Sequence, residues 1–227
     1  MASNPGMAAV AVTPLQVPGR RGRPTAPHVA AIEDEILDAA HALFLEFGYA
    51  AVSMEGISER AGISKGALYA RYAGKEALFR AVIRKRSDIW SAEAGTQDHL
   101  MPRELGLRLI HHARMLVRMF ARTKYCQTSQ LIQTTAISFP DIAIYWQQNG
   151  ARKYIDYLAA DMASVEGPNR GDCPDWQFLA WLLLDGLSGW YGLEALLGAV
   201  SDERMDCFAG QLIETILAAI AAHENPL

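Results

Sequence analysis

Apolar positions recur at helical spacing along almost the whole chain, and no segment alternates regularly between apolar and polar residues as a half-buried strand would. The first apolar stripe runs through residues 29–47 and consists of Ile32, Ile36, Ala40, Leu43, Phe44 and Phe47. Gly48 follows this stripe, at the position where glycine commonly ends a helix. The pattern therefore predicts an all-α protein whose first helix ends near Gly48.

Two short helices follow, and each begins at a residue type that caps helix N-termini. Ser53 begins the first of them and Ser64 begins the second. Gly62 lies in the turn between them, where the chain needs a conformation that most residues avoid. Gly74 ends the second helix, and a longer helix begins near Lys75. Two short helices joined by a tight glycine turn predict a helix-turn-helix.

Further helices are predicted over 103–124, 126–138, 141–164, 175–199 and 203–222. We divide the chain into three parts on this pattern. Residues 1–27 are expected to be a disordered tail with a basic arm, and residues 28–74 a three-helix helix-turn-helix domain that binds DNA. Residues 75–227 are expected to be a second helical domain, to which the family resemblance described below gives the roles of regulation and dimerisation.

The net charge of −4 becomes informative when the chain is divided. Residues 20–86 carry 11 Lys and Arg against 8 Asp and Glu, which gives +3. Residues 87–227 carry 10 against 17, which gives −7. Positive charge is therefore concentrated around the helix-turn-helix, where DNA phosphates would be met, and the acidic remainder is repelled by them.

Several classes of protein are disfavoured by the composition. The most apolar stretch, residues 176–200, is interrupted by Asp185, Glu194 and glycines, so no membrane partner is expected. The three cysteines form no Cys-x-x-Cys motif or disulfide framework, which favours the cytoplasm. We find no pattern of a metal site, a cofactor loop or catalytic residues, and expect none of these.

The second short helix is the candidate DNA-reading element. Its exposed residues are expected to be Ser64, Lys65, Gly66, Ala67, Tyr69, Ala70 and Arg71. Such a helix fits the major groove with its N-terminal end toward the base edges. Lys75 is a cation at a helix start, where the dipole disfavours it, and a bound phosphate would explain its presence there.

Together these motifs resemble the DNA-binding domain of the TetR family. The resemblance covers about Ile32 to Ile83. It is carried by the segments Leu37–Ala39–Ala40, Leu43–Phe44, Phe47–Gly48–Tyr49, Ile57, Ala61–Gly62–Ile63–Ser64–Lys65–Gly66, Leu68–Tyr69 and Gly74–Lys75–Glu76–Ala77–Leu78.

The resemblance implies a role for each matching position. Residues matched to phosphate contacts are Ser53, Tyr69 and Lys75, and residues matched to the groove are Lys65, Gly66, Ala67 and Arg71. The chain departs from the family pattern at Met54, Gly56, Ala67 and Ala70. Because the two alanines can make only apolar contacts with bases, specificity is expected to depend on Lys65, Arg71 and DNA shape.

A basic segment precedes the first helix. Arg20, Arg21 and Arg23 alternate with glycine and proline, which favours an extended cationic arm. Such arms enter narrow minor grooves, where the negative potential is strongest. A solvated basic linker that only adds non-specific affinity is the alternative.

The second half of the chain is predicted to hold a partner chain and an effector. Members of the family are generally dimers, and the segments 175–199 and 203–222 have broad apolar faces that one small subunit would not cover. Residues 130–162 resemble, more loosely, the C-terminal domain of AefR-like members. A pocket for a small apolar or aromatic effector is expected between helices 103–124, 141–164 and 175–199. Its candidate lining residues are Met115, Met119, Phe120, Trp146, Tyr154, Trp181 and Trp190, each of which is alternatively plain core.

The sequence thus favours a ligand-responsive regulator that binds a palindromic operator as a dimer and is released by its effector. A helical carrier or enzyme that kept the fold without specific DNA binding is the alternative from another class. A thiol-responsive regulator using Cys126 or Cys207 is a third hypothesis, and the fold does not decide between repression and activation.

Overall fold

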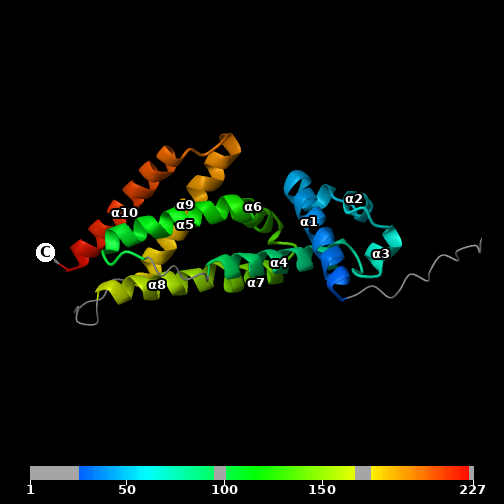
Figure 1. The fold of residues 1–227 in the computed structure, drawn as a ribbon, viewed down its shortest axis with the longest axis horizontal. Coiled ribbons are helices and arrows are strands. Elements are labelled where there is room, and N and C mark those ends of the chain that lie inside the picture. Colours follow the sequence, from blue (N-terminus) through cyan, green and yellow to red (C-terminus); the bar gives the residue numbers. More distant parts are fainter. Residues whose placement is uncertain (1–25, 95–100, 167–174, 225–227) are drawn as a thin grey trace, which may run out of the picture.

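The computed structural model describes residues 26–94, 101–166 and 175–224, and these residues form helices with no strand among them (Figure 1). The helices near the N-terminus are α1 (Ala26–Ala51), α2 (Met54–Arg60), α3 (Lys65–Tyr69) and α4 (Lys75–Ala94). The remaining elements are α5 (Leu105–Thr123), α6 (Tyr125–Thr135), α7 (Pro140–Trp146), the π-helical segment η1 (Gln147–Ala151), α8 (Arg152–Glu166), α9 (Trp176–Leu197) and α10 (Asp202–Glu224). The expected all-α fold is confirmed.

The molecule is elongated, with α1, α2 and α3 grouped at one end (Figure 1). Helix α4 runs from that end into the rest of the molecule, where it packs against α5, α7 and η1. Helices α8 and α9 pack together, and α10 lies against α5 and α9. Buried apolar side chains of both ends form one continuous core.

Glycine defines the turns at the N-terminal end, as predicted. Gly48 leaves the helical conformation inside α1 with φ 75° and ψ 160°, and Gly62 has φ 66° in the turn between α2 and α3. Residues with a Cβ rarely adopt such angles. The side chain of Phe47 differs from the expected apolar stripe, because it is 56 % exposed.

The predicted helix over 141–164 is three consecutive elements, α7, η1 and α8. Pro140 begins α7, because proline has no N–H to continue the preceding helix and fits the first helical turn. The wider π-helical turn at Gln147–Ala151 then interrupts the α-helical hydrogen bonding. The sequence contains no punctuation that predicts this turn, since its Gly150 alone is tolerated in a helix.

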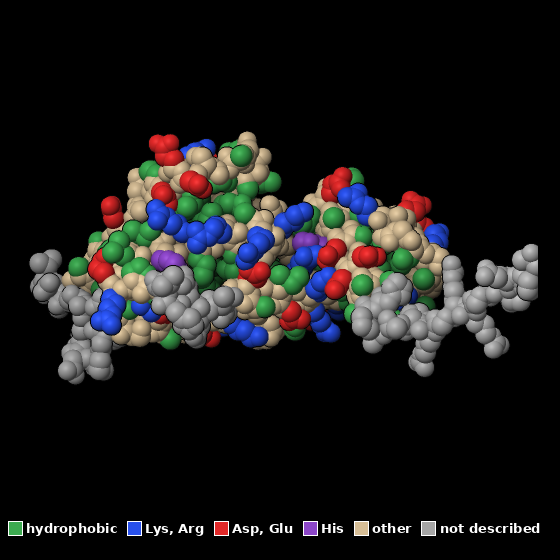
Figure 2. All heavy atoms as spheres, in the orientation of Figure 1, with side chains coloured by type: hydrophobic (Ala, Val, Ile, Leu, Met, Phe, Trp, Pro, Cys, Tyr) green, Lys and Arg blue, Asp and Glu red, His purple; other side chains and the backbone are tan. Residues whose placement is uncertain are grey.

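One helix in the described part of the chain, over Asp202–Ala222 in α10, is long and apolar enough to cross a membrane by length and composition. Only 28 % of it is buried within one chain. Nearby on α9, large apolar side chains are exposed at Leu193, Leu196 and Leu197. Hydrophobic side chains also lie on the surface over α5, α9 and α10 in Figure 2. These helices therefore present apolar surface that a single chain leaves uncovered.

Candidate nucleic-acid interface and sensor core

The α2–α3 unit is built as the sequence predicts. The Ser53 hydroxyl caps α2 by accepting a hydrogen bond from Gly56 N at 3.1 Å, and the Ser64 hydroxyl caps α3 by accepting one from Ala67 N at 3.2 Å. Ile57 and Leu68 are fully buried beneath the two helices. The buried pair fixes how the helices cross, so the start of α3 stays at the surface.

The candidate DNA-reading residues lie together on that surface. Ser64, Lys65 and Gly66 are exposed, Ala67 is half-buried, and Tyr69 is 48 % exposed. A Cβ added to Gly66 would meet no atom within 4 Å, so another backbone or a base can approach it closely. Acidic and basic side chains are interspersed over this end of the molecule on the face shown in Figure 2.

Lys65 and Arg71 make contacts that the sequence did not predict. The Lys65 ammonium forms an ion pair with Glu55 of α2, with Nζ and Oε1 2.8 Å apart. The hydrogen bond from Lys65 lowers the pKa of Glu55 below its usual value. Arg71 folds back and donates from Nη1 to the carbonyl oxygen of Ala67 at 3.0 Å. Glu55 is therefore a member of this surface that sequence reasoning missed.

Lys75 has a structural partner that explains a cation at the start of α4. Its Nζ donates to the carbonyl oxygens of Tyr49 and Ala50, at 2.9 and 3.1 Å, and lies 4.5 Å from the centre of the Tyr49 ring. These carbonyls lie in the short segment that follows the break at Gly48 in α1, and their oxygens accept from the cation. The phosphate contact of Lys75 stays a prediction. Arg20, Arg21 and Arg23 lie outside the described residues.

The structure brings four of the candidate effector residues into one buried core and leaves three at its edge. Met119, Phe120, Trp146 and Tyr154 are buried. Trp90 and Tyr125, which the sequence did not single out, join three of them in an aromatic cluster. Ring centroids are 5.9 Å apart for Trp90–Phe120, 5.3 Å for Tyr125–Trp146 and 6.1 Å for Trp90–Tyr154. The half-buried residues are Met115, Trp181 and Trp190, and Trp190 stacks on Phe208 of α10.

Two buried polar atoms beside this cluster have no hydrogen-bond partner in the described part of the chain. They are the Ser87 hydroxyl oxygen and the Trp90 indole nitrogen, one turn apart on α4. Both face Gly150 of η1, where an added Cβ would lie 3.2 Å from Trp90 Cδ1 and 3.7 Å from Ser87 Oγ. An unpaired buried donor is costly, and π-helical turns recur at functional sites.

A buried polar chain holds Tyr154 in place. His112 is fully buried, and its Nε2–H donates to Asp161 at 2.9 Å, while the other ring nitrogen accepts from the Tyr154 hydroxyl at 3.0 Å. Arg108 donates two hydrogen bonds to the same carboxylate. Burial raises the pKa of Tyr154, so its hydroxyl stays protonated. This series of hydrogen bonds is therefore suited to positioning the Tyr154 ring rather than to nucleophilic chemistry.

An aromatic and ionic joint connects the two ends of the molecule. Phe139, before α7, packs on Tyr49 and Phe79 with ring centroids 4.9 and 5.2 Å apart. Arg80 of α4 donates from Nε to Asp141 at 3.0 Å and lies over the Phe139 ring. The Phe139–Pro140–Asp141 turn thus contacts both α1 and α4.

A second polar contact joins α1 to α6. The Thr128 hydroxyl donates to the Lys124 carbonyl oxygen, so His41 Nε2–H donates to Thr128 Oγ1 at 2.9 Å. Burial, with Arg86 and Lys124 nearby, lowers the pKa of His41 to about 3. This imidazole is therefore neutral at physiological pH.

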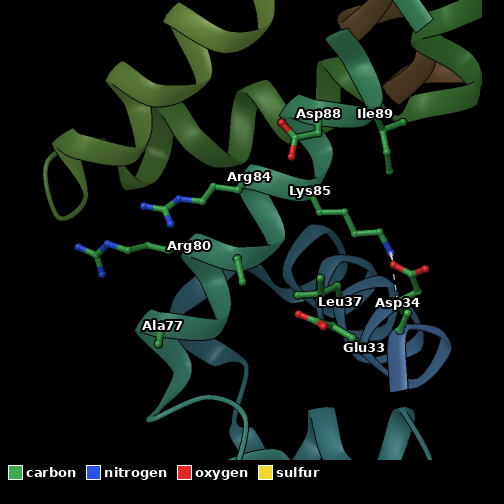
Figure 3. A pocket seen from close by; sticks show the side chains of 11 residues that line it. Glu33, Asp34, Leu37, Ala77, Arg80, Arg84, Lys85, Asp88 and Ile89 are labelled. Carbon is green, nitrogen blue, oxygen red and sulfur yellow. Dashed lines mark hydrogen bonds and ion pairs between the residues drawn. The ribbon is translucent and has the colours of Figure 1, made fainter. Parts of the chain in front are cut away.

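An open groove of about 650 Å³ lies between α1 and α4 (Figure 3). Its α1 wall carries Glu33 and Asp34, and its α4 wall carries Arg80, Arg84 and Lys85. Lys85 reaches across to Asp34 at 2.8 Å, whereas Arg80 and Arg84 point away from α1 (Figure 3). A rotation of α4 against α1 would therefore change the Lys85–Asp34 ion pair.

The described residues also bear on metal and thiol chemistry. The described residues contain no group of three His, Cys, Asp or Glu side chains that could hold a metal ion. Burial raises the pKa of the Cys126 thiol to about 12, which keeps it protonated and unreactive. Cys207 is exposed on α10.

Comparison with known proteins matches the N-terminal helices to bacterial transcriptional regulators. The family model described as bacterial regulatory proteins, tetR family, matches residues 36–82. The transcriptional regulator RutR of Escherichia coli is 40 % identical over 78 residues, which are 34 % of this chain. The repressor Rv1474c of Mycobacterium tuberculosis is 33 % identical over 70 residues. The chain matches only about a third of the length of these relatives, 35 % for RutR and 37 % for Rv1474c.

Solved structures resemble the chain over most of its length. A TetR-family transcriptional regulator from Mesorhizobium loti is 24 % identical with a TM-score of 0.65, over 84 % of this chain and 96 % of its own. The flavonoid-responsive regulator FrrA is 25 % identical with a TM-score of 0.61, over 84 % of this chain and 97 % of its own. The helix-turn-helix and the family model agree that residues 36–82 are a DNA-binding domain of the TetR family of transcriptional regulators, and most of the chain shares its fold with a regulator of that family.

Proposed function

We propose that the protein is a ligand-responsive transcriptional regulator that binds a palindromic operator as a homodimer in the cytoplasm. The observation that carries this proposal is the capped, exposed start of α3, which is supported on a buried α2–α3 core and presents Lys65, Tyr69 and Arg71 together. A helix supported in this way fits the major groove. Repression by effector-released binding is our working assignment, since the similar protein Rv1474c is a transcriptional repressor.

The apolar surfaces of α9 and α10 support the homodimer. Helix α10 is 28 % buried over its apolar stretch, and Leu193, Leu196 and Leu197 of α9 are more than half exposed. Burying such surfaces against a second copy removes apolar area from water. A two-fold axis through these helices would present two α3 helices to successive major grooves.

DNA selection with variants tests the DNA-binding part of the proposal. Wild-type protein is expected to enrich a palindrome from random duplex DNA. Lys65→Ala and Arg71→Ala should each cost about 1–3 kcal/mol on the selected operator, whereas Tyr69→Phe should weaken binding to all sequences alike. Gel-shift titration at two salt concentrations measures both effects.

Arg152→Ala is the matched control, since it removes one exposed cation on α8, far along the chain from α3. Operator affinity that responds equally to Arg152→Ala and to Lys65→Ala would contradict the interface. If no palindrome is enriched and affinity only falls as salt rises, binding is non-specific, and a helical carrier that kept the fold becomes the better reading.

The aromatic cluster supports an aromatic effector that carries a hydrogen-bond acceptor. Such a molecule would stack among Trp90, Phe120 and Tyr154 and accept from the unpaired Trp90 N–H and Ser87 O–H. Tyr191 offers an entrance, because its ring contacts Phe120 and also lines an open groove of about 430 Å³ between α5 and α10. The similar regulator FrrA is flavonoid-responsive, and flavonoids are aromatic and bear such acceptors.

Ser87→Ala separates this effector role from a structural one. Removing an unpaired buried hydroxyl should leave the melting temperature unchanged or raise stability by up to about 1 kcal/mol. The same change should weaken binding of the flavanone naringenin by up to about tenfold, measured by quenching of tryptophan fluorescence. Ser91→Ala is the control for a hydroxyl with a structural role. Ser91 donates to the Asn149 carbonyl oxygen, so its loss should destabilise the protein, unlike the loss of the Ser87 hydroxyl. Absence of quenching in the wild type would contradict this ligand class.

A further inference from the structure

Glu55 and Lys65 form the polar contact that joins α2 to α3 on the proposed DNA-facing surface. Each lies in the first turn of its helix, and their charged atoms are 2.8 Å apart. The side chains are 47 % and 59 % exposed, so both reach solvent while touching each other. A carboxylate thus lies beside the first residue of the helix proposed to read DNA.

Fold stability does not account for this pair. Ion pairs between exposed side chains contribute little, because solvent screens them and ordering two long side chains costs entropy. Ser53 and Ser64 already cap the two helices, and Ile57 and Leu68 already fix their packing. A cation in the first turn of α3 is also disfavoured by the helix dipole. The pair is therefore better explained by the DNA bases that it would contact.

The major-groove edge of a G·C pair displays what this ion pair can bind. Guanine presents two acceptors, N7 and O6, and cytosine presents a donor, the N4 amino group. Lysine contacts guanine, and glutamate accepts from cytosine N4. We propose that Glu55 is a specificity-determining residue, which together with Lys65 reads one G·C pair in each operator half-site. This inference rests on the proposed DNA-binding function.

Glu55 would act by rejection as well as by attraction. Its pKa is held below the usual value by the hydrogen bond from Lys65, so it is ionised and can only accept. Thymine O4 and guanine O6 are acceptors too, and placing either of them against the Glu55 carboxylate is unfavourable because neither can donate to it. Phosphates repel it as well, so Glu55 lowers affinity for random DNA while raising the preference for the correct sequence.

Selection and titration with two charge-matched variants test this inference. Wild type, Glu55→Ala and Glu59→Ala are each selected against random duplex DNA and then titrated on the enriched operator and on its single base-pair variants. Glu59 is an exposed carboxylate of the same helix α2 and serves as the control for net charge. Far-UV circular dichroism establishes that all three proteins are folded.

Wild type should prefer G·C over the other pairs at one position of each half-site. Glu55→Ala should lose roughly ten- to a hundredfold of that preference and gain affinity for random DNA, whereas Glu59→Ala should keep the preference. A Glu55→Ala protein with an unchanged base preference, or an equal loss in Glu59→Ala, would overturn the inference while leaving the regulator in place. A wild type that enriches no sequence would overturn both.

Discussion

Replacing Asp161 with alanine should lower the free energy of unfolding by about 3 kcal/mol at neutral pH. The Asp161 side chain is 9 % exposed and accepts from the fully buried His112 and from Arg108, which is 17 % exposed. Removing the carboxylate leaves a mostly buried guanidinium without its counter-charge, and breaking a buried pair typically costs about 3–5 kcal/mol. We expect the lower end, because Arg108 still reaches solvent.

The same carboxylate should make stability depend on acid pH. Burial alone would raise the pKa of Asp161, but the hydrogen bonds from Arg108 and His112 outweigh it and hold the pKa well below the usual range. Its contribution is therefore fully present above the unfolded pKa of about 3.9 and is lost as the pH falls toward the folded pKa. Wild type should lose stability below about pH 4 more steeply than Asp161→Ala does.

Urea unfolding between pH 7 and pH 3 measures both effects. Asp156→Ala is the matched control, because Asp156 lies on the same helix and pairs with Arg152 while 49 % exposed. Its loss should change stability by no more than about 0.5 kcal/mol. Equal losses in the two variants would mean that the buried chain from Arg108 to Tyr154 adds nothing beyond a surface ion pair.

Replacing Phe139 with alanine should cost about 3–5 kcal/mol and separate the unfolding of the two ends of the molecule. The Phe139 ring is 6 % exposed and packs on Tyr49 of α1 and Phe79 of α4. It is contributed by the turn before α7, so its removal takes aromatic packing out of the joint itself. Arg80 would also lose the ring on which it lies.

The tryptophans provide a means of observing this separation. All five lie at or beyond position 90, so tryptophan fluorescence reports on the regulatory end, whereas circular dichroism reports on every helix. In Phe139→Ala the dichroism transition should begin at lower urea than the fluorescence transition. Ile137→Ala, a change at a 98 % exposed side chain two residues away, should keep the two coincident and alter stability by no more than about 0.5 kcal/mol. Coincident transitions in Phe139→Ala would show that the joint does not depend on this ring.

Local patterns in the sequence predicted most of the fold. Serine caps, positive-φ glycines and apolar stripes act over a few residues, so Ser53, Gly62 and Ser64 could be assigned before the structure was known. The extent of the π-helical turn after Trp146 could not, because its hydrogen bonding depends on how α7 and α8 pack against α4.

The candidate sites were predicted less completely, since contacts distant in sequence leave no periodic signal. Nothing in the sequence pairs His112 with Asp161 or brings Trp90 to Tyr154, and the two histidines at 111 and 112 gave no reason to favour a buried polar chain. Glu55 was missed because a carboxylate in a first helical turn is ordinary. Its proposed role depends on the ion pair with Lys65, which lies ten residues further along the sequence.

The contact of Lys75 with the end of α1 has a consequence for how operator strength can change during evolution. The Lys75 ammonium, which is proposed to bind a phosphate, already donates hydrogen bonds to the carbonyl oxygens of Tyr49 and Ala50 in α1. A substitution of Lys75 would therefore change both the stability of the domain and its affinity for DNA. Selection for a different operator affinity at this position would also be selection on folding. The ion pair of the exposed Glu55 contributes little to folding, so divergence in DNA preference among descendants of this protein should accumulate at position 55 first.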